Sequence, residues 1–203
     1  MKVLLIPFGM RCNSAKVVDA IVKQPRLPFD WTQMNEETMI QVLQLSKETT
    51  VPFWKSYFSN IDTTNHNRLT GSWLPHDTFV TEEERHFSVE KYVRRTMRLQ
   101  TALSRDEHKV FVVFFGFPEI HTMSITEKII HGIRTRCKEN YSVILCNARF
   151  QQYKEGNFFF IYEPLHQTAS EDENKDWNDL TARIEMRIRG ILTEQAYEPL
   201  PID

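Results

Sequence analysis

Cys12 is the residue of this chain that the sequence places best for nucleophilic chemistry. It follows a short apolar run, Val3 to Phe8, whose length and β-branched content are typical of a buried strand. After it, apolar residues recur at helical spacing over 15–22, with Asn13 or Ser14 as the candidate cap. We therefore expect Cys12 where the carboxyl end of a strand turns into a helix, which is where open α/β sheets bind ligands. The helix dipole and unpaired amides there favour the nucleophilic thiolate. The alternative is a small buried side chain that fills the junction.

A nucleophilic cysteine needs a nearby base, normally a histidine that an acid or an amide orients. Among the seven histidines, His76 stands out because aromatic and aliphatic residues flank Pro75-His76-Asp77 in an otherwise polar region. A histidine of an ordinary surface loop is the alternative interpretation. Asp77 and Asn147, the latter at the end of a later predicted strand, are lower-ranked candidates for the orienting residue.

Asp30 is the second candidate site residue. It lies between Phe29 and Trp31, and we expect all three residues to be buried. Because an unpaired carboxylate is costly to bury, Asp30 should then form hydrogen bonds or an ion pair. One hypothesis is that Asp30 orients His76, and another is that it pairs with an arginine. Equally, its side chain can hold the loop backbone in an Asx turn.

Lys91, Arg94, Arg95 and Arg98 are three and four residues apart, so they form one cationic face of a predicted helix. Arginine binds carboxylate and phosphate in bidentate geometry, which makes Arg94, Arg95 and Arg98 candidates for an anion-binding site. An ordinary solvated face is the alternative, and Arg94 or Arg95 is also a candidate partner for Asp30.

Short motifs in the first half of the chain, over about Val3 to Phe115, together resemble a known family. They are Gly9-Met10-Arg11-Cys12, Pro28-Phe29-Asp30-Trp31, Pro75-His76-Asp77 and Lys91-Tyr92-Val93-Arg94-Arg95-Thr96-Met97-Arg98. They are similar to the GxxC start, the PFDW tetrapeptide, the histidine–aspartate segment and the KYxRRxxR helix of a family named for papain-like cysteine peptidases, from bacteria and large DNA viruses. The resemblance implies a cysteine hydrolase with Cys12 as nucleophile and His76 as base.

The order of the predicted elements indicates an α/β fold: a single three-layer domain over residues 1–203 with a mixed, centrally parallel sheet. The unbroken apolar runs at 110–117 and 141–147 predict neighbouring parallel strands that are buried on both faces, with Val3 to Ile6 in the same sheet. A hairpin-like connection at 151–156 leads to a further strand at 157–162. The charge run Glu82 to Arg85 is interpreted as a solvated turn before a helix that begins at Ser88.

The composition limits the partners and the compartment. A net charge of −2 and a pI near 6.4 give no overall electrostatic footprint for nucleic acid. The three cysteines are too widely spaced for a metal motif, and no cofactor is expected. The apolar run near the start of the chain is shorter than the apolar core of a signal peptide, and no apolar run reaches membrane-spanning length. These features favour an intracellular, cytoplasmic protein with free thiols.

Two functional hypotheses follow. The first is an intracellular hydrolase that uses Cys12, His76 and Asp30 on an amide or similar acyl bond of a protein or peptide substrate. The second is a non-catalytic α/β module that binds a partner protein or an anionic ligand, including a contact between virus and host.

Overall fold

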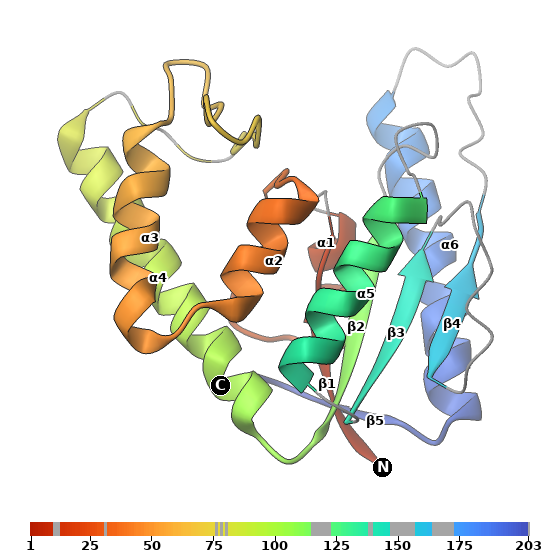
Figure 1. Cartoon of the computed structure of the whole chain (residues 1–203). Helices are drawn as coiled ribbons and strands as arrows, with labels where there is room; N and C mark the ends of the chain where they lie inside the picture. The colour runs from red at the N-terminus through yellow and green to blue at the C-terminus, as the bar shows by residue number, and fades with distance from the viewer. Residues whose placement is uncertain are drawn as a thin grey trace.

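A parallel β-sheet runs through the centre of the molecule (Figure 1). The structure is a computed structural model that describes residues 1–9, 13–30, 32–75, 77, 79, 81–114, 123–137, 140–146, 157–163 and 173–202. Within these residues, the strands are β1 (Lys2–Pro7), β2 (His108–Phe114), β3 (Tyr141–Cys146), β4 (Phe158–Ile161) and β5 (Glu198–Leu200). Their order across the sheet is β4-β3-β2-β1-β5, and every neighbouring pair is parallel.

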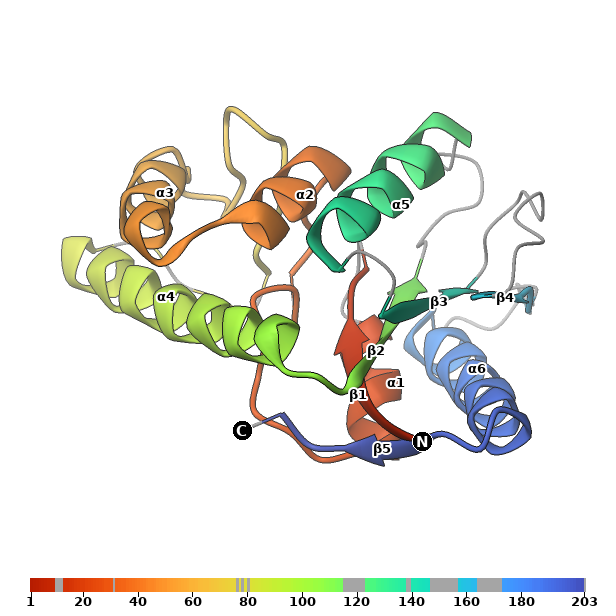
Figure 2. The same ribbon diagram turned by 60° about the horizontal axis from the view of Figure 1, so that its bottom comes forward.

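Helices cover both faces of the sheet and complete three layers. α1 (Asn13–Ile21) and α6 (Glu173–Glu194) lie on one face, while α2 (Glu36–Gln44), α3 (Lys47–Ser59), α4 (Glu82–Ser104) and α5 (Met123–Cys137) lie on the other (Figure 2). The β2–α5–β3 and β4–α6–β5 crossovers move along the sheet in opposite directions. Because such crossovers are right-handed, α5 and α6 come to opposite faces.

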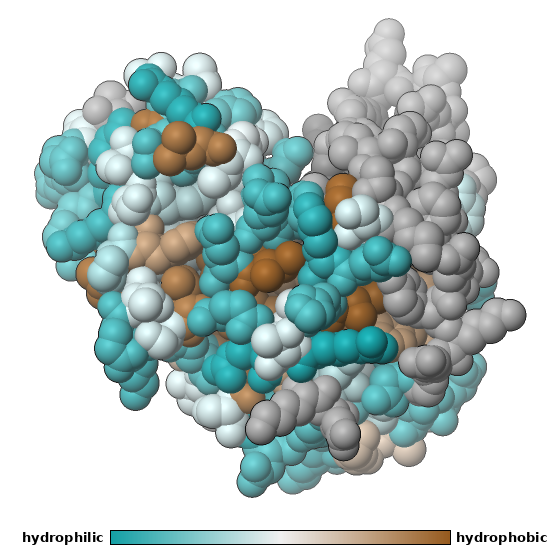
Figure 3. Space-filling view, in the orientation of Figure 1, coloured by the Kyte–Doolittle hydropathy of each residue, from teal (hydrophilic) through white to brown (hydrophobic). Residues whose placement is uncertain are grey.

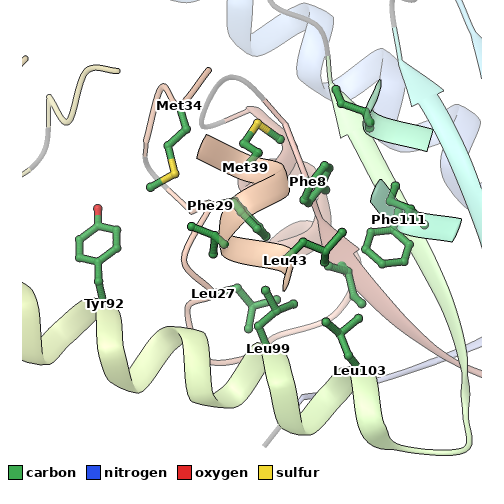
Figure 4. Close-up of a cluster of buried hydrophobic side chains, with 14 of the residues drawn as sticks. Phe8, Leu27, Phe29, Met34, Met39, Leu43, Tyr92, Leu99, Leu103 and Phe111 are labelled. Atoms are coloured by element: carbon green, nitrogen blue, oxygen red, sulfur yellow. The ribbon is translucent and has the colours of Figure 1, made fainter. Parts of the chain in front are cut away.

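The sheet buries a separate apolar core on each face, and β1 contributes to both. Leu4, Ile6 and Phe8 pack under α2–α5, whereas Val3 and Leu5 pack under α1 and α6. Successive strand residues point to opposite faces, so a strand between two cores must be apolar throughout. Figure 4 shows the first core, in which side chains from α2, α4 and the 27–29 loop meet those of β1 and β2.

The predicted α/β class is confirmed, as is the pairing of the three apolar runs in one parallel arrangement. Leu5 lies opposite Val110 in β2, and Phe111 lies opposite Val143 in β3. The mixed sheet and the hairpin-like connection are corrected, because β4 also runs parallel to β3. β4 therefore begins at the same end of the sheet as β3.

The start of α4 differs from the prediction. Glu82 to Arg85, predicted as a solvated turn, forms the first turn of α4. Thr81 Oγ1 accepts a hydrogen bond from the Glu84 amide at 3.1 Å, and the Glu84 carboxylate accepts one from the Thr81 amide at 2.9 Å. This capping box and the acidic first turn stabilise a helix start there. No helix within the described ranges is both long and apolar enough to cross a membrane.

Candidate functional site

The carboxyl ends of β1 and β2 define the place in this fold where a ligand site is expected. After β1 the chain enters α1 on one face of the sheet, and after β2 it reaches α5 on the other. Neighbouring strands whose connections leave to opposite faces open a crevice at their carboxyl ends, and ligands of open α/β sheets bind in such crevices. Gly9 lies in this position: a Cβ atom there would be 2.9 Å from Ser14 Oγ and 3.0 Å from the Phe114 carbonyl oxygen. Any larger residue would push α1 away from the end of β2.

The elements predicted around Cys12 are present. β1 ends at Pro7 and α1 begins at Asn13, with Asn13 and Ser14 buried. Cys12 itself lies outside the described residues, as do His76, Trp31 and Asn147. Their roles therefore stay predictions that rest on the sequence.

Asp30 is buried at this end of the sheet, with 2% of its surface exposed, and its neighbour Phe29 is fully buried. The Phe29 ring packs edge-on against Phe8, which directly follows β1, with 4.7 Å between ring centroids (Figure 4). The predicted burial of both residues is confirmed. The Phe8–Phe29 contact thus places the Asp30 loop beside the residues that lead into the Cys12 segment.

The two carboxyl oxygens of Asp30 have different surroundings. Oδ2 accepts a hydrogen bond from the Leu27 amide at 2.9 Å, which closes the loop locally. Oδ1 is buried and has no hydrogen-bond partner among the described residues. Loss of hydration raises the pKa of Asp30 to about 7, although the Leu27 amide and the nearby charges of Arg95 and Arg26 act in the opposite direction. A carboxyl group with a pKa near neutrality can hold or release a proton under physiological conditions, as acid–base residues do.

Four residues of the KYxRRxxR motif bind the Asp30 loop and Asp77, the residue that follows His76 in the sequence. We call Lys91, Tyr92, Arg95 and Arg98 the α4 bracket. Lys91 forms an ion pair with Asp77, and the Tyr92 hydroxyl donates to Asp77 Oδ2 at 2.9 Å.

The other two members of the α4 bracket hold the Asp30 loop. Arg95 Nη1 donates to the Asp30 carbonyl oxygen at 3.4 Å, and Arg98 Nη1 donates to the Arg26 carbonyl oxygen at 3.1 Å. Lys91 and Arg95 are one helical turn apart, about 6 Å along the helix axis. Asp77 and the 26–30 loop therefore dock next to each other on one face of α4.

The ring of Tyr92 fixes the bracket within the core. Tyr92 is fully buried against Trp54 and Phe58, with ring centroids 4.8 Å and 5.2 Å away. The Arg95 guanidinium lies over the Tyr92 ring, with its Cζ atom 5.1 Å from the ring centroid. Burial is the main cause that raises the pKa of Tyr92, so its hydroxyl stays protonated and donates to Asp77.

The predicted anion-binding arginines differ in their contacts. Arg95 and Arg98 each donate to a backbone carbonyl, so part of each guanidinium already has a protein partner. Arg94 is half exposed and lies 3.8 Å from the Glu90 carboxylate, in an i,i+4 ion pair. The hydrogen bond from Arg95 goes to the Asp30 backbone rather than to its carboxylate. Anion binding by Arg94, Arg95 and Arg98 stays a prediction.

A polar network at the opposite end of the sheet was missed by sequence reasoning. His108 Nε2 is 2.7 Å from Ser142 Oγ, and His108 Nδ1 is 3.1 Å from Asn140 Oδ1. The three residues have the contacts of a serine–histidine–amide triad, but Ser142 has no exposed surface and also contacts Tyr197. With no access to Ser142, the network joins the starts of β2 and β3. No sequence motif signals it, because the β2–β3 pairing alone brings these residues together.

Within the described part of the chain, no group of three or more histidine, cysteine, aspartate or glutamate side chains is placed to hold a metal ion. Comparison with family models, with curated proteins and with solved structures finds no match to this chain.

Proposed function

We propose that this protein is a cysteine hydrolase that cleaves an amide or similar acyl bond, with Cys12 as the nucleophile and His76 as the base. The observation that carries the proposal is the α4 bracket. It docks the segment next to His76 and the loop of Asp30 on one helix face, and that loop packs against the end of β1. The motifs are far apart in sequence, so packing of a single helix against both loops is the arrangement that a shared site requires.

In this proposal the Cys12 thiolate attacks the carbonyl carbon, and backbone amides at the start of α1 stabilise the resulting oxyanion. The His76 imidazolium gives its proton to the leaving amine as the carbon–nitrogen bond breaks, which leaves a thioester. Imidazole then takes a proton from water, whose oxygen attacks the thioester to release the acid and restore Cys12. Asp30 is a positioning residue that orients His76, and its pKa near neutrality lets its charge respond to the imidazolium.

Alkylation with iodoacetamide near neutral pH, mapped by mass spectrometry, tests the nucleophile against two internal references. Burial raises the pKa of Cys137 to about 11 and also raises the pKa of Cys146, which has no exposed surface. Cys12 should therefore react much faster than both. His76→Ala should slow that reaction, whereas His131→Ala, at an exposed position on α5, should leave it unchanged.

Turnover is tested separately by incubation with a peptide library, with Cys12→Ser as the inactive control. An inert Cys12 in a protein whose circular dichroism shows it to be folded would overturn the hydrolase proposal in favour of a binding module. A reactive Cys12 that is indifferent to His76→Ala would overturn the assignment of His76 as base. Reactivity without turnover of any peptide would contradict a peptidase activity.

A further inference from the structure

A basic pocket lies where α3 ends and α4 begins. Figure 1 shows these two helix ends at the same end of the α3–α4 pair. Its volume is about 630 Å³, within the usual range for small-molecule sites. Lys55, Arg68 and Arg85 bring three cations to its walls, from α3, from the following loop and from α4 respectively. Figure 3, in the same orientation, shows mostly hydrophilic side chains at this end of the molecule. The chain as a whole has a net charge of −2, so this local positive charge is not a reflection of the overall composition.

Arg85 is held in place before any ligand arrives. Its Nη1 atom donates to the carbonyl oxygens of Phe58 and Ile61, at 2.9 Å and 3.0 Å, where α3 ends. Among the described residues its other guanidinium N–H groups have no hydrogen-bond partner. A planar guanidinium fixed by one nitrogen presents the remaining donors in a constant direction, which is the arrangement that binds phosphate or carboxylate oxygens.

Lys55 and Arg68 are exposed, and neither side chain forms an ion pair or hydrogen bond with another described residue. Both are therefore free to turn toward an anion beside Arg85. Glu82, at the start of α4, is the acidic residue among the pocket's lining residues. His86 also lines the pocket, 3.4 Å from the Glu90 carboxylate.

The apolar lining residues Phe58, Ile61 and Val89 belong to the core between α3 and α4, where they are 1%, 3% and 9% exposed. They offer a ligand little apolar surface, so recognition in this pocket rests on its charges. Three cations suit a phosphate monoester, which carries about −1.5 to −2 at neutral pH, better than a carboxylate with a single charge.

We propose that this pocket binds a phosphate monoester, with Arg85, Arg68 and Lys55 around the phosphate. The proposal is independent of the hydrolase chemistry, because it uses neither Cys12 nor His76. Small molecules and phosphorylated side chains of proteins share this chemical group. A phenyl phosphate probe and a phosphotyrosine peptide distinguish the two sources.

Isothermal titration calorimetry of the full chain at low ionic strength tests the pocket. Phenyl phosphate should bind more tightly than benzoate, which has the same ring but a single negative charge. Arg68→Gln and Lys55→Gln should each weaken it about five- to tenfold, the loss of one charge-assisted hydrogen bond that is open to solvent. Glu82→Gln should strengthen binding, since it removes the opposing charge. Lys47→Gln removes the same charge from the far end of α3 and should leave the affinity unchanged.

Arg85→Gln would break two hydrogen bonds to backbone carbonyls, so it would change the stability of the protein as well as its affinity for phosphate. Absence of saturable phenyl phosphate binding would overturn the proposal. An equal loss in Lys47→Gln and Arg68→Gln would also overturn it, because the binding would then follow total charge rather than the pocket. Much tighter binding of the phosphotyrosine peptide would assign the site to a phosphorylated protein, and similar binding of both probes to a small molecule.

Discussion

At the scale of single residues, the two carboxyl oxygens of Asp30 have unlike surroundings. One oxygen closes its own loop through the Leu27 amide, while the other is buried and has no hydrogen-bond partner among the described residues. Loop closure alone explains only the first oxygen. A buried polar atom without a partner costs free energy, and native proteins keep such atoms mainly where chemistry or binding uses them. The unpartnered oxygen is therefore the part of Asp30 that a functional role would explain.

Protonation of Asp30 should make stability depend on pH. Its pKa of about 7 in the folded protein lies above the ordinary value of 3.8, so folding strengthens proton binding. The stabilising contribution is therefore complete below the ordinary pKa and is lost as the pH rises through about 7. Asp30→Asn stays neutral and keeps an acceptor for the Leu27 amide. Between roughly pH 5 and 8 the free energy of unfolding of wild type should fall relative to this variant, by a few kcal/mol at most.

Urea denaturation at a series of pH values measures this difference. Asp179→Asn, an exposed change on α6, is the matched control and should follow the wild-type curve. Asp30→Ala removes the acceptor and should lower the free energy of unfolding by roughly 1–3 kcal/mol at low pH, where the wild-type carboxyl is protonated. The difference from wild type should shrink as the pH rises through about 7. Parallel curves for wild type and Asp30→Asn would show that Asp30 does not titrate in this range.

At the scale of elements, α4 connects the motifs. Its first turn is capped by Thr81, its middle binds Asp77 through Lys91 and Tyr92, and its later turns bind the 26–30 loop. A long helix is suited to this task because its backbone is rigid and its side chains recur on one face every three to four residues. The KYxRRxxR motif therefore has a structural role that is independent of any anion.

The bracket predicts a specific cost for the loss of one hydroxyl group. Tyr92→Phe keeps the ring among Trp54 and Phe58 but removes the donor to Asp77. We expect the free energy of unfolding to fall by about 1–2 kcal/mol, since Lys91 still pairs with the carboxylate. Chemical denaturation measures it, and Tyr162→Phe, at a half-exposed tyrosine, should change stability by less than about 0.5 kcal/mol. Equal stabilities of Tyr92→Phe and wild type would show that the Tyr92–Asp77 hydrogen bond does not help to hold Asp77 on α4.

At the scale of the whole molecule, the central strands couple the two cores. β1, β2 and β3 are buried on both faces. A substitution that destabilises the core under α1 and α6 should therefore also destabilise the layer of α2–α5. Ile184→Ala removes a fully buried side chain from the core under α6 and should cost about 2–5 kcal/mol. Cooperative unfolding through the sheet predicts an equal loss of protection from hydrogen exchange in α3 and α4.

Hydrogen exchange read by mass spectrometry tests this coupling. Met186→Ala, at an exposed position on the same helix, should leave the protection of α3 and α4 unchanged. If Ile184→Ala lowered protection only in α1 and α6, the two faces would unfold as separate units.

The sequence by itself determined the α/β class, the parallel arrangement of β2 and β3 with β1 in the same sheet, and the burial of Phe29 and Asp30. These features follow from local patterns: an apolar run without alternation can only be satisfied between two layers, and a carboxyl group between aromatic residues is carried inward with them. The cationic face at 91–98 was equally clear from spacing alone.

Only the tertiary structure decided what those residues touch. The contacts of Arg95 with the Asp30 carbonyl and of Tyr92 with Asp77 join segments far apart in the chain, and no local pattern specifies such a partner. The parallel direction of β4 shows in its pairing with β3 and does not follow from its own composition. The basic pocket combines Lys55, Arg68 and Arg85 from three different segments. Each of these features depends on the packing of helices and loops on the sheet, and that packing is set by side-chain shape over the whole core.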